Sequence, residues 1–99
     1  MISVWRVSLQ LARDDGAPLS DDGIGRLTER LTNGPVPPDV TRHDPRAVLV
    51  EMTVDARDEM AARYSAESTL REAANEVWAA LGLPPFTIAF VEVVPAPGR

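Results

Sequence analysis

Residues 35–46 read PVPPDVTRHDPR, a stretch that holds four of the chain's nine prolines and its single histidine. A connection of about eleven residues without regular structure is uncommon in a compact domain. Within it, Val40–Arg42 has the composition of a strand, and residues 43–46 resemble a turn with Pro45 near its centre. We therefore expect a short, irregular strand that forms a hairpin with the segment after it. Its prolines favour a sheet edge, because proline cannot donate a hydrogen bond to a strand ladder.

Three other segments carry strand patterns. Ala47–Val54 alternates, with Val48, Val50, Met52 and Val54 on one face. Ile2–Leu11 also alternates, with Trp5, Val7, Leu9 and Leu11 on one face. Phe86–Val94 is apolar on both faces, and we expect Phe86, Ile88 and Phe90 to face the core and Ala89, Val91 and Val93 to face outward.

Two segments have the periodicity of amphipathic helices. The first follows Ser20, a good N-cap, repeats Ile24, Leu27 and Leu31, and stops at Asn33-Gly34. The second is expected to begin at Asp55 as N-cap, with Asp58 in the capping-box position, and to run to about Leu81. Its expected apolar stripe is Met60, Tyr64, Leu70, Ala74, Val77, Trp78 and Leu81. Gly82 is the expected left-handed residue after the helix, where Leu83 would contact Trp78.

The resulting order, β-α-β-β-α-β, resembles the ferredoxin-like split βαβ fold over almost the whole chain. The resemblance implies an α+β domain with a four-stranded antiparallel sheet and both helices on one face. Ile2–Leu11 and Ala47–Val54 would be the central strands, and the proline-rich strand would be short and irregular. We expect a single domain over residues 1–95 and a flexible tail over residues 96–99. This fold hosts many functions, so function must be argued from particular residues.

Bulk properties restrict the function classes. The chain of 99 residues has ten basic and fifteen acidic side chains and therefore a net charge of −5. This charge disfavours nucleic-acid binding, because nucleic-acid phosphates bind to clustered positive charge. The absence of cysteine excludes disulfides and thiolate metal sites, and it fits a cytoplasmic protein. No apolar run is long enough to span a membrane, and the first residues lack the features of a signal peptide. No motif for a cofactor, a metal or a catalytic group is present.

The face of the sheet opposite the helices is the main candidate site. Its candidate interface residues are Ile2, Val4, Arg6, Leu49, Glu51 and Thr53. Arg6 and Glu51 can pair across the two central strands. Apolar positions beside an ion pair are typical of a contact surface. This pattern predicts a small non-catalytic interaction domain that forms a homodimer or docks on another protein.

An alternative is a small enzyme or ligand-binding protein. Such a chain would resemble the dimeric α/β-barrel proteins, with a pocket for a small molecule between sheet and helices. The residues expected around that pocket are Trp5, Met52, Tyr64, Glu67 and His43. Against this, His43 has no orienting partner other than its neighbour Asp44, and it reads as a turn residue. Glu67 reads as the edge of the helix's apolar stripe.

Overall fold

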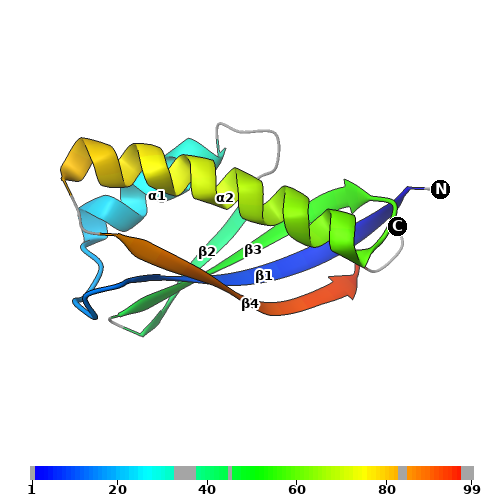
Figure 1. Cartoon of the computed structure of the whole chain (residues 1–99), viewed down its shortest axis with the longest axis horizontal. Coiled ribbons are helices and arrows are strands. Elements are labelled where there is room, and N and C mark those ends of the chain that lie inside the picture. The colour runs from blue at the N-terminus through cyan, green and yellow to red at the C-terminus, as the bar shows by residue number, and fades with distance from the viewer. Residues whose placement is uncertain (1, 33–37, 45, 83–84, 97–99) are drawn as a thin grey trace.

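The described part of the chain folds into six elements (Figure 1). The computed structural model describes residues 2–32, 38–44, 46–82 and 85–96. The elements are β1 (Ser3–Arg13), α1 (Asp21–Thr32), β2 (Pro38–Asp44), β3 (Ala47–Ala56), α2 (Glu59–Leu81) and β4 (Phe86–Pro95). This order confirms the α+β ferredoxin-like fold.

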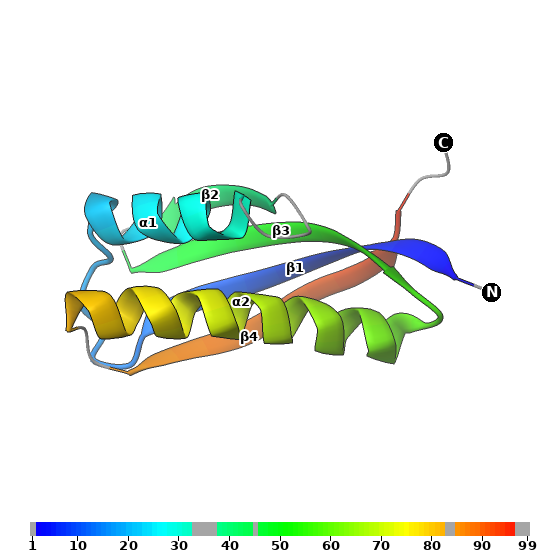
Figure 2. The same cartoon turned by 90° about the horizontal axis from the view of Figure 1, so that it is seen from above.

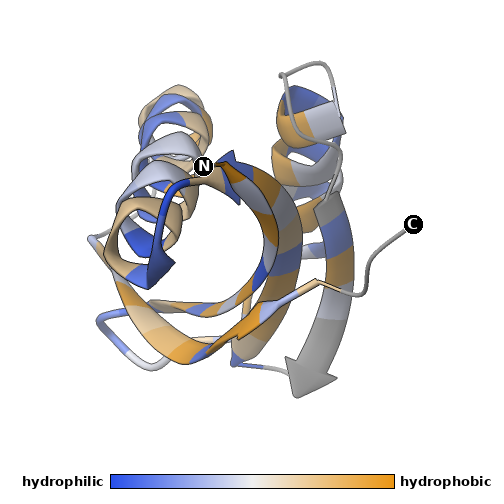
Figure 3. Ribbon diagram, turned by 90° about the vertical axis from the view of Figure 1, so that its right-hand side faces the viewer, coloured by the Kyte–Doolittle hydropathy of each residue, from blue (hydrophilic) through white to orange (hydrophobic). Residues whose placement is uncertain are grey.

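The four strands form one antiparallel sheet in the order β2-β3-β1-β4. The two central strands are β1 and β3, as the sequence predicts, and Arg6 stands opposite Thr53 in their register. Both helices lie on the same side of a curved sheet (Figure 3). From above, α1 lies over β2, while the longer α2 packs against β3, β1 and β4 (Figure 2). The opposite side of the sheet therefore carries no helix formed by the described residues.

The proline-rich stretch does form an edge strand. β2 pairs with β3 from Pro38 opposite Met52 to Asp44 opposite Ala47. The strand is longer than Val40–Arg42, and the backbone of His43 belongs to it rather than to a turn. The predicted turn of four residues, 43–46, was too long. Asp44 pairs with Ala47, so only two positions separate the paired residues of the two strands. A register irregularity between Arg42 and Asp44 fits the expected irregular strand.

The boundary between β3 and α2 corrects one prediction. Asp55 is not the N-cap, because β3 continues through Ala56, which pairs with Ser3 and accepts a hydrogen bond from Trp5 Nε1 at 3.1 Å. The N-cap is Asp58, whose backbone is extended and whose Oδ1 accepts from the backbone N–H of Ala61 at 2.8 Å. The strand thus extends two residues beyond its sequence pattern because β1 provides partners for them.

We predict that Asp58→Ala lowers the free energy of unfolding by about 1 kcal/mol, since it removes the capping acceptor. Asp55→Ala serves as the matched control, and we expect a change within about 0.5 kcal/mol because Asp55 is exposed on a strand. Urea unfolding followed by circular dichroism measures both variants. If Asp55→Ala lowered the free energy of unfolding more than Asp58→Ala, the assignment of Asp58 as the N-cap of α2 would be wrong.

Two other helix ends follow the sequence, while the stop expected at Asn33-Gly34 lies outside the described residues. Ser20 Oγ accepts from the backbone N–H of Gly23 at 3.0 Å, which confirms the N-cap of α1. Gly82 ends α2 with φ +65°, a conformation that favours glycine, and its N–H points to the carbonyls of Trp78 and Ala79. The ring of Trp78 meets that of Phe86 edge-on at 5.3 Å between centroids, which fixes the start of β4 against α2. Leu83, expected to contact Trp78, lies outside the described residues.

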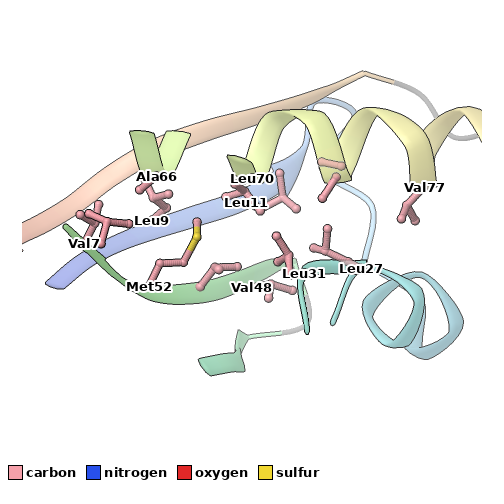
Figure 4. Close-up of a cluster of buried hydrophobic side chains, with 14 of the residues drawn as sticks. Val7, Leu9, Leu11, Leu27, Leu31, Val48, Met52, Ala66, Leu70 and Val77 are labelled. Atoms are coloured by element: carbon pink, nitrogen blue, oxygen red, sulfur yellow. The ribbon is translucent and has the colours of Figure 1, made fainter. Parts of the chain in front are cut away.

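The core lies between the sheet and the two helices (Figure 4). The sheet contributes buried Val7, Leu9, Leu11, Val48, Val50, Met52 and Val54, with Trp5 half-buried against them, as predicted. The helices contribute Leu27, Leu31, Ala62, Ala66, Leu70, Ala73, Ala74, Val77 and Trp78.

The first half of α2 packs differently from the prediction. Met60 and Tyr64 were expected in the apolar stripe but are 69% and 76% exposed. Ala62 and Ala66 occupy the core side instead, with no exposed surface. The stripe continues from Leu70 through alanines spaced by four residues, which lets this half of the helix approach the sheet closely. Large apolar side chains at Met60 and Tyr64 are consequently on the outer side.

A bulge in β4 changes which residues face the helices. Leu9 pairs with Phe90, but Ser8 pairs with Glu92, so Val91 has no partner on β1. Phe86, Ile88 and Phe90 pack against the core as predicted, and so does Val93, which was expected to face outward. The extra residue shifts the alternation by one position. Val91 itself is 55% exposed.

Candidate functional site

Five of the six predicted interface residues lie on the uncovered face of the sheet. In the β1–β3 register Val4 stands opposite Asp55, Ser8 opposite Glu51, and Gln10 opposite Leu49. Val4, Leu49 and Glu51 are half-buried, while Arg6 and Thr53 are exposed. Since the helices pack on the other side, these side chains share one open surface. We call it the open face.

The sixth residue, Ile2, lies at the end of the sheet. It precedes β1 and is 71% exposed. Together with Asp55–Arg57, Ala61 and Ser65 it lines a groove of about 610 Å³ beneath the first half of α2. It therefore borders both the open face and the helix side.

Charged side chains occupy the middle of the open face. Arg6 Nε lies 4.0 Å from Glu51 Oε2, so the pair expected from the sequence is present. Ser8 stands between Glu51 on β3 and Glu92 on β4, which places a second carboxylate beside Arg6. An exposed pair of this kind adds at most about 1 kcal/mol to stability. The arrangement of Arg6 between carboxylates therefore affects the charge of this surface more than it affects the stability of the fold.

Strand β4 extends the open face in a way that the sequence did not predict. Ala89 stands opposite Gln10, and Val94 stands opposite Arg6. Val94 was not predicted here because the bulge at Val91 reverses the alternation after it. The face thus has a polar band formed by Arg6, Ser8, Glu51 and Glu92, in which Ser8 is buried at 6% exposure. Apolar residues lie around this band: Val94 stands opposite Arg6 and Val4 lies beyond it at one end, while Leu49 and Ala89 lie on either side of Gln10 at the other end.

The residues of the alternative pocket are separated in the structure. Met52 is buried in the core with 1% exposure, and half-buried Trp5 donates to Ala56. Tyr64 points to solvent, and Glu67 Oε2 accepts from Arg71 Nη2 at 2.9 Å, one turn along α2. None of these four side chains lines the groove beneath α2 or the groove between the two helices. The side chain of His43 lies outside the described residues.

A second groove, of about 290 Å³, runs between the two helices. It is lined by Arg26, Glu29, Arg30, Glu76, Val77 and Ala80. The guanidinium of Arg30 bonds the carboxylate of Glu76, which lowers the pKa of Glu76 and raises the pKa of Arg30. Arg26 Nε pairs with Asp22 at 3.1 Å. Because both arginines already have carboxylate partners, this groove ties α1 to α2 and offers little charge to an anionic ligand.

Among the described residues, no three His, Asp or Glu side chains come together in a way that could hold a metal ion. No helix in the described part of the chain combines the length and apolar character needed to cross a membrane.

Comparison with known proteins supports the fold. The sequence matches no family model and no curated protein. A solved structure resembles it, the YXEP protein of Bacillus subtilis, described as a dinuclear metal binding peptidase from the M20 family. The match covers 96% of this chain and 27% of that chain, with a TM-score of 0.52 and 20% identity. At that identity the likeness shows the fold alone, and this fold occurs there as part of a longer chain.

Proposed function

We propose that this chain is a small, non-catalytic interaction domain that binds a second copy of itself through the open face. The observation that carries the proposal is the arrangement of that face. It is a four-stranded surface that neither of the two described helices covers, on which half-buried Val4 and Leu49 lie near a charged band. Partly exposed apolar side chains gathered on an uncovered sheet face support a contact surface. A chain without cysteine also fits the cytoplasmic location that we include in the proposal.

The charge pattern favours a second copy as the partner. Arg6 is the one cation among the described residues of the polar band, and carboxylates at Glu51 and Glu92 flank it. A two-fold axis places the same patch on both partners, so residue contacts are reciprocal. Stacking one band on the other lets each Arg6 approach a carboxylate of the opposite copy. The apolar ends of the two faces then cover each other.

We predict that Arg6→Glu weakens self-association by about tenfold, a loss of about 1.4 kcal/mol. The variant leaves three neighbouring carboxylates on each face, which then repel those of the other copy. The double variant Arg6→Glu with Glu51→Arg restores one cation beside carboxylates and should recover most of the affinity. Analytical ultracentrifugation at several concentrations measures both dissociation constants. Equal constants for wild type and Arg6→Glu would rule out the band as the centre of the contact.

A further inference from the structure

Two neighbouring rows of side chains cross the middle of the open face, and they differ in length and charge. In the first row, Ser8 on β1 stands between Glu51 on β3 and Glu92 on β4. Ser8 is 6% exposed, and its hydroxyl has no hydrogen-bond partner among the described residues. We call this the acidic row, in which a short side chain with an unbonded hydroxyl lies between two longer carboxylates.

The second row has the opposite character. Arg6 on β1 stands between Thr53 on β3 and Val94 on β4. Its Nε lies 4.0 Å from Glu51 Oε2, which is longer than a hydrogen bond, and its side chain is 51% exposed. We call this the arginine row, in which a long cationic side chain lies between two short ones. The loose pair with Glu51 leaves guanidinium donors available to another chain.

We propose that the arginine row of each copy docks on the acidic row of the other, with Arg6 lying over Ser8. This assignment rests on the proposed function, because it specifies the register of the open-face contact. A two-fold axis that crosses the strands at Val7 stacks β1 antiparallel on β1 of the second copy. Arg6 and Ser8 lie one residue to either side of Val7, about 3.4 Å from it along the strand, so the axis exchanges their positions.

The two rows complement each other in size and in charge. The long side chain of one row lies over the short side chain of the other, and the two glutamates lie over threonine and valine. An arginine has five N–H donors in a plane, enough to bond both carboxylates and the hydroxyl of Ser8. Asp39 on β2 stands opposite Glu51 and adds negative charge beside this position. Because the axis makes every contact twice, one chain supplies both the cation and its receptor.

The apolar residues of the open face fit the same register independently. The axis at Val7 exchanges positions 4 and 10, so Val4 comes to lie over Gln10 of the other copy. Gln10 stands between Leu49 on β3 and Ala89 on β4. Stacked sheets are usually rotated by about 30°, which moves Val4 toward one of these two side chains and hardly moves Arg6, which is nearer the axis. In both cases an apolar side chain meets another.

Neighbouring registers lack this fit. An axis one residue earlier, at Arg6, would place the two arginines over each other, so that like charges meet. An axis one residue later, at Ser8, would place Arg6 over the uncharged Gln10 of the other copy. The register at Val7 is the one of these three that puts Arg6 between two carboxylates.

Two leucine substitutions on the same face of the same strand test the register. Ser8→Leu fills the space over which Arg6 of the other copy would lie, and it should raise the dissociation constant at least about tenfold. Gln10→Leu is the matched control. It adds an apolar group opposite Val4 and should leave the dissociation constant unchanged or lower it. Sedimentation equilibrium at several concentrations measures both, and circular dichroism checks that both variants are folded.

A mixture of two charge variants tests the pairing between copies. The acidic variant is Arg6→Glu, and the basic variant is Glu51→Arg with Glu92→Arg. Each variant alone brings like charges together, whereas the mixture brings opposite charges together at both contacts. We therefore expect native mass spectrometry to show a dimer of one acidic and one basic chain. The control replaces the basic variant with Glu59→Arg and Glu72→Arg, which change the net charge equally at exposed positions of α2 and should leave the acidic variant a monomer.

The outcomes separate the register from the proposed function. If wild type is a monomer at every concentration, both fail. If wild type associates but Ser8→Leu weakens association no more than Gln10→Leu does, the register at Val7 is wrong and the open-face contact still stands. The absence of a mixed dimer from folded charge variants would likewise overturn the register. If the basic variant does not fold, the two leucine variants decide.

Discussion

Replacing Leu70 with alanine is expected to lower the free energy of unfolding by about 2–5 kcal/mol. Leu70 has no exposed surface and lies beside Leu11 where α2 crosses the sheet (Figure 4). The helix that carries it is fixed at both ends by caps, so it cannot easily move to fill the cavity. A domain of this size has about 5–15 kcal/mol of stability in total. The substitution should therefore remove a large part of it.

Met60→Ala on the same helix is the matched control. It also removes a large apolar side chain, but Met60 is 69% exposed, so we expect a change within about 0.5 kcal/mol. Urea unfolding of both variants provides the comparison. A smaller loss for Leu70→Ala than for Met60→Ala would contradict the orientation of α2.

The sequence predicted the fold correctly because its strongest signals are local. Alternation in Ala47–Val54 and Ile2–Leu11 identified both central strands, and Gly82 marked the end of α2. The edge strand within residues 35–46 followed from the length of that connection and its prolines. These signals depend on neighbouring residues in the chain and need no tertiary information.

The errors arose where distant partners decide the structure. β3 extends to Ala56 because Ser3 and Trp5 bond it, and nothing near Asp55 in the sequence reveals these partners. The bulge at Val91 is visible only in the pairing with β1. Tyr64 was expected in the core because it is large and apolar, yet the smaller Ala62 and Ala66 pack there.

In the candidate site, too, residues on the central strands were predicted from local sequence, whereas residues whose orientation depends on distant strand pairing were missed. Arg6 and Glu51 were predicted as a pair because alternation places both on one face, and the structure contains that pair. Glu92 and Val94 were not predicted as part of this face, because the bulge changes their orientation. Sequence alternation can thus identify a face on the central strands and fails on a strand whose register shifts.

Leu49→Arg is expected to raise the dissociation constant of the open-face contact by at least about a hundredfold, or about 2.7 kcal/mol. Leu49 is half-buried between Gln10 and Thr41 on the neighbouring strands. In the separated chain an arginine there can keep its guanidinium in water, so the fold should survive. In the contact, the same group would be buried without a partner, which is strongly unfavourable.

Asn75→Arg is the control for this substitution. It adds the same positive charge at an exposed position of α2, away from the open face. The mass of the Asn75→Arg assembly in solution should equal that of wild type, because the substitution does not alter the open face. A shared decrease in mass would point to net charge as the cause rather than to the open face.

The central claim is that the open face binds a second copy, and sedimentation equilibrium on wild type and Leu49→Arg tests it most directly. We predict that wild type has a mass above that of a single chain and that Leu49→Arg halves it, while circular dichroism of the two stays the same. If wild type is a monomer, or if both proteins have the same mass, the open face does not mediate self-association.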